Sequence, residues 1–134
     1  MNTTIKQLYS EKKITTVLII AMFFGLFVLS VQAEDAKIRD MKIFYQNHCV
    51  KCHGPDGSAM SEDGKKLKGE DFTDQRWQID TSDEEMIKTI MNGKFFGLAM
   101  PAFKDKLSQE DIQLMVTEII RKAAKGNIIA PQAE

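Results

Sequence analysis

The chain has 134 residues with 18 basic and 19 acidic side chains, so its formal charge near neutral pH is only −1. This balance excludes the strongly basic surface of a nucleic-acid-binding protein. Two cysteines are too few for a disulfide framework, and once an N-terminal targeting segment is set aside the remaining length suits one small domain.

The first 33 residues have the pattern of a secretory signal peptide. Lysines precede a mostly apolar stretch over 14–31, and Val31-Gln32-Ala33 places a small residue just before the composition turns acidic. We therefore predict a signal peptide over 1–33 and a periplasmic location. An uncleaved anchor that holds the protein at the membrane, facing the periplasm, stays open because the apolar stretch approaches the roughly 20 residues of a membrane span.

The first helix of the exported part is predicted from about Asp35 to His48. Its apolar residues recur every three to four positions and form one stripe: Ile38, Met41, Phe44 and Tyr45. Gly54-Pro55-Asp56-Gly57 follows and ends the helical stretch. The helix therefore leads directly into five residues with a distinctive chemistry.

Cys49-Val50-Lys51-Cys52-His53 has the C-x-x-C-H spacing that attaches a c-type haem covalently. Positions i and i+3 of a helical turn lie on one face, so Cys49 and Cys52 can reach one porphyrin edge as thioethers. His53 then turns its imidazole toward the iron. The motif predicts one covalently attached haem c, and the chemistry of the protein is then that of the iron.

The cysteine pair fits three rival kinds of site less well. A thioredoxin-like site needs a βαβ context, and no strand pattern surrounds the pair. A disulfide between positions i and i+3 closes too short a loop to stabilise the fold. A zinc site needs four ligands, and the available ones all lie within one short stretch: His48, Cys49, Cys52 and His53.

After the motif, the stretch from Ser58 to Thr81 is predicted as a long loop with many charges and few apolar residues. A long loop in a small domain needs a reason, and wrapping a prosthetic group supplies one. This loop carries the only tryptophan, Trp77. Two interpretations of this residue stay open. Its indole N–H donates a hydrogen bond to a haem propionate, or its ring only packs in the core of the loop.

Two further helices are predicted from their ends. Ser82 and Glu85 suit a capping box, and Asn92-Gly93 ends that helix. Ser108 is the expected N-cap of the last helix. Because no alternating strand pattern appears, the predicted fold class is all-α.

A haem iron bound by His53 has one axial position left. The only other histidine, His48, precedes the attachment turn and cannot cross to the opposite haem face. A methionine thioether is the natural alternative, and Met100 lies in a loop where Pro101 keeps the preceding backbone extended. We predict Met100 as the second ligand, with Met60, a lysine or an open position as the remaining alternatives.

These motifs together resemble the class I cytochromes c of the small bacterial periplasmic type, over about residues 36–125. The shared features are C-x-x-C-H-G, the Asn92-Gly93 helix end and Met100-Pro101-Ala102-Phe103 before a last helix. The resemblance implies a small cytochrome c fold, with three or more helices wrapped around one haem that transfers electrons. It also implies the residues that hold the haem: Cys49, Cys52, His53 and Met100.

The chain departs from this family in three places. Met41 stands where the family usually has a glycine, and no aromatic residue stands near Glu118, where the last helix normally meets that glycine. We expect the two exchanges together to preserve the packed volume. The family often uses a proline carbonyl to accept a hydrogen bond from the proximal histidine. No proline occurs between Pro55 and Pro101, so the sequence does not identify the acceptor for His53.

The predicted function is a one-electron carrier, not an enzyme, that works between protein redox partners and binds no nucleic acid. The predicted haem domain covers 34–126, and a flexible tail follows over 127–134. Membrane contact is expected only if 1–33 is retained. A haem-bearing subunit of a periplasmic dehydrogenase or reductase complex is the alternative, and a haem enzyme or gas sensor is a more distant one.

Several lysines flank the two motifs. They form either a collar that steers acidic redox partners or an ordinary solvated surface, because acidic residues are interspersed among them. The lysines in question are Lys51, Lys65, Lys66, Lys94, Lys104 and Lys106.

Overall fold

The computed structural model describes residues 34–131, and from Lys37 onward these residues belong to one compact unit. The predicted signal peptide over 1–33 and residues 132–134 lie outside the described part, so cleavage and anchoring stay predictions. Within the described part, no helix is both long enough and apolar enough to cross a bilayer. The domain boundaries expected at 34 and 126 also stay predictions.

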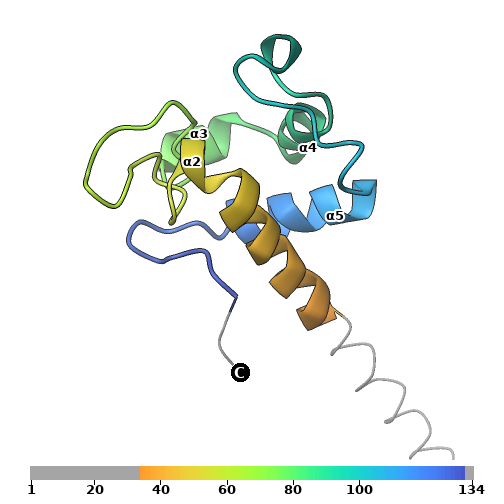
Figure 1. Ribbon diagram of the computed structural model, residues 1–134, viewed down its shortest axis with the longest axis horizontal. Coiled ribbons are helices and arrows are strands. Elements are labelled where there is room, and N and C mark those ends of the chain that lie inside the picture. Colours follow the sequence, from red (N-terminus) through yellow and green to blue (C-terminus); the bar gives the residue numbers. More distant parts are fainter. Residues whose placement is uncertain (1–33, 132–134) are drawn as a thin grey trace, which may run out of the picture. The chain divides into compact units, whose positions relative to one another are not determined.

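Helices are the only extended regular elements between residues 34 and 131, which confirms the all-α prediction (Figure 1). A helix over 34–48 leads into the attachment turn. The other elements follow in chain order: α2 (Val50–His53), α3 (Gln75–Asp80), α4 (Asp83–Asn92), the 3₁₀ turn η1 (Phe95–Gly97), α5 (Gln109–Leu114) and the π-helix η2 (Met115–Ile120).

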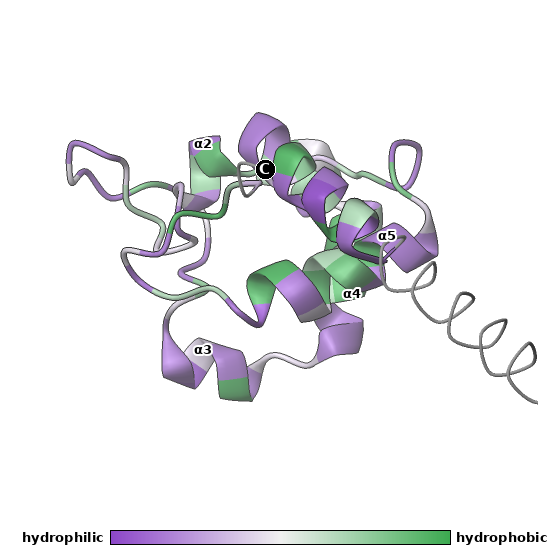
Figure 2. Ribbon diagram, turned by 90° about the horizontal axis from the view of Figure 1, so that it is seen from below, coloured by the Kyte–Doolittle hydropathy of each residue, from purple (hydrophilic) through white to green (hydrophobic). Residues whose placement is uncertain are grey.

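The apolar stripes expected from the helical spacing form the core. Met41 and Tyr45 of the first helix are buried, as are Met86 and Ile90 of α4. The stripe of the last helix is buried throughout: Ile112, Met115, Val116, Ile119 and Ile120. α4 packs against both α5 and η2, and Figure 2 shows hydrophobic and hydrophilic residues alternating along the helices. Burial of these amphipathic faces is what holds the short helices together.

α3 lies inside the stretch from Ser58 to Thr81 that is expected to be loop, so that prediction is wrong for residues 75–80. Asp74 caps the helix, because its carboxylate accepts from the backbone N–H groups of Arg76 at 2.8 Å and Trp77 at 3.0 Å. So short a helix shows too little of the 3.6-residue period to be recognised. The aspartate cap is its only clear signal in the sequence.

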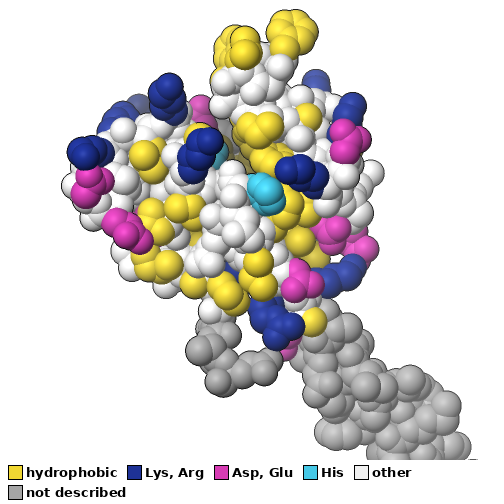
Figure 3. All heavy atoms as spheres, viewed as in Figure 1, with side chains coloured by type: hydrophobic (Ala, Val, Ile, Leu, Met, Phe, Trp, Pro, Cys, Tyr) yellow, Lys and Arg dark blue, Asp and Glu magenta, His cyan; other side chains and the backbone are white. Residues whose placement is uncertain are grey.

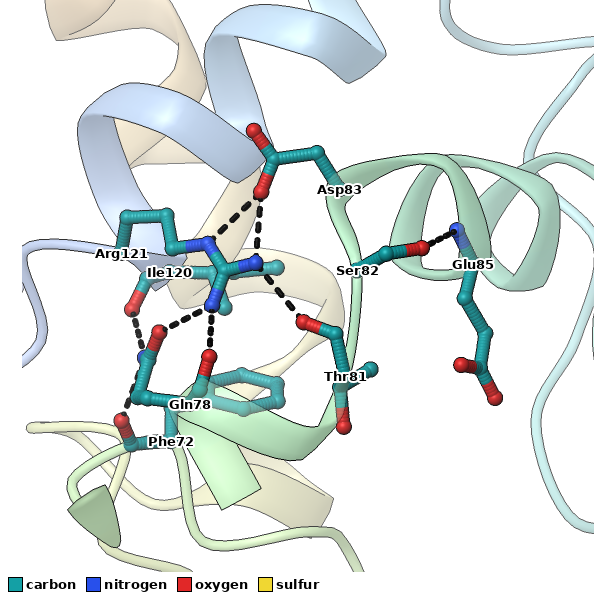
Figure 4. A network of polar contacts seen from close by, with 8 residues as sticks. All are labelled: Phe72, Gln78, Thr81, Ser82, Asp83, Glu85, Ile120 and Arg121. Atoms are coloured by element: carbon teal, nitrogen blue, oxygen red, sulfur yellow. Dashed lines mark hydrogen bonds and ion pairs between the residues drawn. The ribbon is translucent and has the colours of Figure 1, made fainter. Parts of the chain in front are cut away.

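The caps of the two later helices differ in detail. The Ser82 hydroxyl accepts from the Glu85 N–H at 3.2 Å, but the Glu85 carboxylate points away from Ser82 (Figure 4). The capping box expected there is therefore only half formed. Ser108 forms a complete one, because its hydroxyl accepts from the Asp111 N–H at 3.2 Å and its own N–H donates to the Asp111 carboxylate at 3.1 Å.

The last helix changes geometry halfway. After α5 the backbone widens into η2, and the Arg121 N–H donates to the carbonyl of Val116, five residues back, at 2.9 Å. A π-helical turn takes an extra residue and shifts everything after it around the helix axis. In the position that results, Arg121 reaches the segment between α3 and α4 (Figure 4).

The stretch after Gly126 contacts the loop that follows the attachment motif. The Ile129 N–H donates to the Pro55 carbonyl at 2.8 Å, and the Ile129 side chain is part of the buried core. The Gly126 N–H donates to the buried carboxylate of Asp56 at 2.7 Å. These contacts join the C-terminal stretch to the domain as far as Ile129, while the flexible tail expected over 127–134 stays a prediction.

Candidate functional site

One cavity of about 470 Å³ brings the predicted site residues together. Cys49, Cys52 and His53 line it from the attachment turn, and Met100 lines it from the loop between α4 and α5. Met60, the other methionine considered as a ligand, does not line this cavity. The remaining wall is largely apolar and aromatic, with contributions from Phe44, Phe72, Trp77, Ile90, Phe103 and Leu107.

Backbone contacts hold the attachment turn in shape. The His53 N–H donates to the Cys49 carbonyl at 2.9 Å, which places both residues on one helical turn. α2 ends at Gly54, whose φ of 80° suits glycine. A Cβ at Gly54 would lie 2.4 Å from the Met60 carbonyl oxygen, and the Tyr45 hydroxyl donates to the Gly54 carbonyl at 2.9 Å. The glycine of the motif therefore lets the chain turn sharply behind His53.

His53 is oriented by a carbonyl that the sequence does not identify. Its Nδ1 lies 3.0 Å from the Glu70 carbonyl oxygen, and its ring stacks on Phe72 with the centroids 4.3 Å apart. Burial lowers the pKa of His53, and the bond to the Glu70 carbonyl only partly opposes that effect. A neutral imidazole that donates from Nδ1 keeps the lone pair of Nε2 available for iron.

Gly69 explains how the Glu70 carbonyl comes so close to the imidazole. A Cβ at Gly69 would lie 2.5 Å from the Cys52 carbonyl oxygen and 2.6 Å from His53 Nδ1. The Gly69 N–H also donates to the Cys52 carbonyl at 2.8 Å. Any side chain at this position would push the segment away from the histidine. Gly69 is the one sequence signal for this contact, and beside Gly64 in the same loop it does not stand out.

The described residues around the cysteine pair do not form a zinc site. Burial raises the pKa of the Cys49 thiol to about 12, and the nearby Cys52 adds to the shift. A structural zinc site needs four ligands. Among residues 34–131, no group of three or more His, Cys, Asp or Glu side chains is arranged to hold a metal ion.

The loop that carries Met100 is bonded to the end of α4. The Lys94 N–H donates to the Met100 carbonyl at 2.9 Å. Gly93 has a φ of 71°, and a Cβ there would lie 2.4 Å from the same carbonyl oxygen. Beyond Met100, the Phe103 N–H donates to the Ile90 carbonyl at 2.9 Å. These contacts fix the backbone on both sides of Met100.

Glu70 and Lys94 link the segments that carry the two predicted iron ligands. Glu70 contacts His53 through its carbonyl, while its carboxylate lies 3.8 Å from Lys94 Nζ. Lys94 in turn bonds Met100 through its backbone N–H. The ion pair is about half exposed and weak by itself. It nevertheless joins the two segments at the edge of the cavity, which both residues line.

A polar network supports the cavity wall near Trp77. Arg121 donates to the Asp83 carboxylate at 2.7 Å and to the carbonyls of Gln78 and Thr81 (Figure 4). The Gln78 amide donates to two further backbone carbonyls. Because the guanidinium and the amide are bonded on several sides, the segment between α3 and α4 is held against the last helix. Trp77 lines the cavity, and the propionate bond considered for its indole stays a prediction.

The chain is similar to known cytochromes. A family model described as cytochrome C oxidase, cbb3-type, subunit III matches residues 36–117. Cytochrome c6 of Leptolyngbya boryana is 36% identical over 85 residues, which cover 63% of this chain and 91% of the relative. Among solved structures, the KustC0563 c-type cytochrome is 34% identical, covers 63% of this chain and 96% of its own, and has a TM-score of 0.49.

The residues present fit a covalently attached haem. Two cysteines lie one helical turn apart, the adjacent His53 has its Nδ1 bonded to a carbonyl, and all three line the apolar cavity. The matched family model covers more than half of the chain. The chain belongs to this family of c-type cytochromes, which transfer electrons through a covalently bound haem c.

Proposed function

We propose that this chain is a monohaem electron carrier whose iron is bound by His53 and Met100. The observation that supports it most is the shared cavity, because Met100 lines it together with the attachment turn although the two lie far apart in the sequence. His53 uses Nδ1 on the Glu70 carbonyl, which leaves Nε2 for the iron. A thioether on the other side favours ferrous iron and raises the reduction potential.

Three other side chains near the cavity are less suited to bind the iron. Met86 and Met115 also line it, but they are only 4% and 2% exposed and belong to the packed helix stripes. Methionines in such positions act as core filler. The His48 ring contacts Phe44 of its own helix, with the centroids 4.4 Å apart. Met100 lies in a loop, so its side chain can face the iron without disrupting the core.

Bound haem supplies a one-electron change between ferric and ferrous iron. The chain contributes the surroundings: a largely apolar cavity wall, the side chains of His53 and Met100, which would bind the iron, and a link between their segments through Glu70 and Lys94. If His53 and Met100 both bind the iron, no position on it would remain for a substrate. For this reason we propose a carrier, not a haem enzyme or a gas sensor.

The absorption spectrum of the ferric holoprotein tests the ligand assignment. Thioether ligation gives low-spin ferric haem a weak absorption band at the red end of the visible range. We expect this band in the wild type and in Met60→Ala, a matched control whose side chain is outside the cavity. We expect its loss in Met100→Ala. Persistence of the band in Met100→Ala, or its absence from the wild type, would show that Met100 is not the ligand.

We also propose that the protein is exported to the periplasm and exchanges electrons with other proteins there. The support is the signal-peptide pattern over 1–33, directly before the haem domain. Retention of this segment as a membrane anchor is the alternative. Mass spectrometry of the protein from its native cells distinguishes them: cleavage after Ala33 supports a released carrier, and an intact N-terminus supports an anchored one.

The family description favours a second candidate function, a haem-bearing subunit of a larger redox complex. The matched family is named for subunit III of a cbb3-type oxidase, whereas the sequence-based alternative is a subunit of a dehydrogenase or reductase. Size-exclusion chromatography of a mild-detergent extract, followed by haem staining, separates the two candidates. Haem signal at the size of the single chain supports the carrier, and signal only in a larger assembly supports the subunit.

A further inference from the structure

The loop before Met100 presents large apolar side chains that nothing in the described part of the chain covers. Phe95, Phe96 and Leu98, here named the aromatic tip, are 75%, 107% and 91% exposed. This loop rises at the top of Figure 1, and Figure 3, in the same view, shows hydrophobic side chains projecting there. Single exposed apolar residues are ordinary, but a cluster of large ones indicates a binding surface.

The backbone holds the aromatic tip in its exposed arrangement. Phe95 and Phe96 have φ values of 52° and 55°, in the left-handed region that bulky residues rarely adopt. The Gly97 N–H donates to the Lys94 carbonyl at 3.2 Å, and the Leu98 N–H donates to the Phe95 carbonyl at 3.1 Å. Strained backbone of this kind concentrates where proteins contact ligands and partners.

The aromatic tip lies beside the opening of the haem cavity. Phe95 and Met100 both line the cavity, and Lys94 pairs with Met100 at the base of the tip. Phe96 and Leu98 do not line the cavity, so their apolar surface is available to another molecule. A molecule that covers them comes close to the segment that carries the predicted iron ligand, where an electron can leave.

The charges near the aromatic tip fit a protein better than a lipid surface. Lys94 at its base pairs with Glu70 at 3.8 Å, and Lys68 and Glu85 line the same cavity as Phe95 of the tip. Figure 3 shows both basic and acidic side chains on the face below the projecting hydrophobic ones. Binding to anionic lipid is favoured by predominantly basic flanks. An apolar centre with a rim of mixed charge is typical of a protein interface.

We propose that the aromatic tip inserts into an apolar recess beside the redox centre of the electron-transfer partner. This rests on the proposed carrier function and specifies the partner as a redox protein with an apolar pocket and a rim of mixed charge. Aromatic side chains seated in such pockets often contribute most of the binding energy of an interface. Apolar association depends little on salt, whereas steering by a lysine collar weakens as salt rises.

The experiment measures how fast the reduced holoprotein is oxidised by a detergent-solubilised membrane extract and by the soluble periplasmic fraction of its native cells. The test variant combines Phe96→Asn, because asparagine tolerates left-handed backbone, with Leu98→Ser. The matched control is Ile79→Gln, which removes an exposed apolar side chain of α3 that does not line the cavity. Oxidation by ferricyanide shows that the haem of each variant is intact.

We expect the tip variant to be oxidised at least about tenfold more slowly, as for loss of an interface anchor. The control and the ferricyanide rates stay unchanged, and the wild-type rate varies little with salt. Equal rates for the tip variant and the control, or a rate that falls steeply with salt in both, would overturn the proposal. Tip-dependent sedimentation with vesicles of phosphatidylglycerol and phosphatidylcholine, with no effect on oxidation, would assign the tip to lipid. Failure of both fractions to oxidise the wild type would instead contradict the carrier function itself.

Discussion

Replacing Gly69 with alanine should raise the reduction potential of the haem and weaken the fold. The new Cβ would lie 2.6 Å from His53 Nδ1, so the segment must retreat by about 0.8 Å to reach an ordinary contact of 3.4 Å. That retreat stretches the 3.0 Å contact between Nδ1 and the Glu70 carbonyl oxygen to about 3.8 Å, which is too long for a hydrogen bond.

Loss of the Glu70 carbonyl as acceptor affects both the stability of the fold and the reduction potential. A part-buried imidazole N–H without a partner costs about 1–3 kcal/mol of stability. A carbonyl acceptor also makes the ligand more basic and favours ferric iron, so its loss favours the ferrous form. A tenfold change in an equilibrium constant corresponds to about 1.4 kcal/mol, or to about 59 mV for one electron. If the loss of the acceptor destabilises the ferric form alone by about 1 kcal/mol, the reduction potential therefore rises by about 40 mV.

Potentiometric titration and guanidinium unfolding of the Gly69→Ala holoprotein measure both consequences. The matched control is Gly64→Ala, in the same loop, where a Cβ has nothing within 4 Å and only the φ of 78° is unfavourable. We expect the control to lose a little stability and to keep the wild-type potential. An unchanged potential in Gly69→Ala, or an equal rise in both variants, would refute the role of the Glu70 carbonyl.

Three further substitutions test the packing around the site. Arg121→Ala should cost about 2 kcal/mol, because its partners lose charged hydrogen bonds. Lys122→Ala, which removes only the pair with Glu118 four residues earlier, should cost below about 0.5 kcal/mol. Equal losses of the two variants in guanidinium unfolding would contradict the network. Burial raises the pKa of Asp56, but hydrogen bonds from Ser58 and from a backbone N–H outweigh it and leave the pKa lowered. The stability that Asp56 contributes is therefore present above its unfolded pKa of about 3.9 and is lost as the pH falls through the lower folded value. Asp56→Asn should accordingly be less stable than the wild type at pH 7 and nearly equal to it in strong acid, and a difference that does not vary with pH would rule this out. Met41→Gly should cost about 3–5 kcal/mol through a core cavity and a weaker helix, and a neutral or stabilising effect in the same assay would disprove the proposed volume exchange.

The parts of the site that follow from local sequence are predictable, and the parts that depend on distant contacts are not. The attachment turn needs only the spacing of Cys49, Cys52 and His53, and the buried stripes follow from the helical period. Met100 stands out because histidines are scarce and its loop is flanked by helices. The motif and the stripes are contained in short windows of sequence, whereas the scarcity of histidines is a property of the whole chain.

The acceptor for His53 could not be predicted, because it is a backbone carbonyl and every residue of the loop carries one. Only the close approach at Gly69, visible in three dimensions, singles out Glu70. Helix α3 could not be predicted because so short a helix gives no periodic signal in the sequence. The π-helix η2 could not be predicted because its residues keep the apolar spacing of an α-helix. Only the hydrogen bond from the Arg121 N–H to the Val116 carbonyl shows the wider turn.

Carbon monoxide binding to the reduced holoprotein tests most directly whether His53 and Met100 fill both axial positions. Carbon monoxide needs an open position on ferrous haem. We expect the wild type to keep its spectrum under carbon monoxide and Met100→Ala to change promptly to that of a ligand complex. Prompt binding by the wild type would show an open iron and would contradict an electron carrier with His53 and Met100 as its ligands.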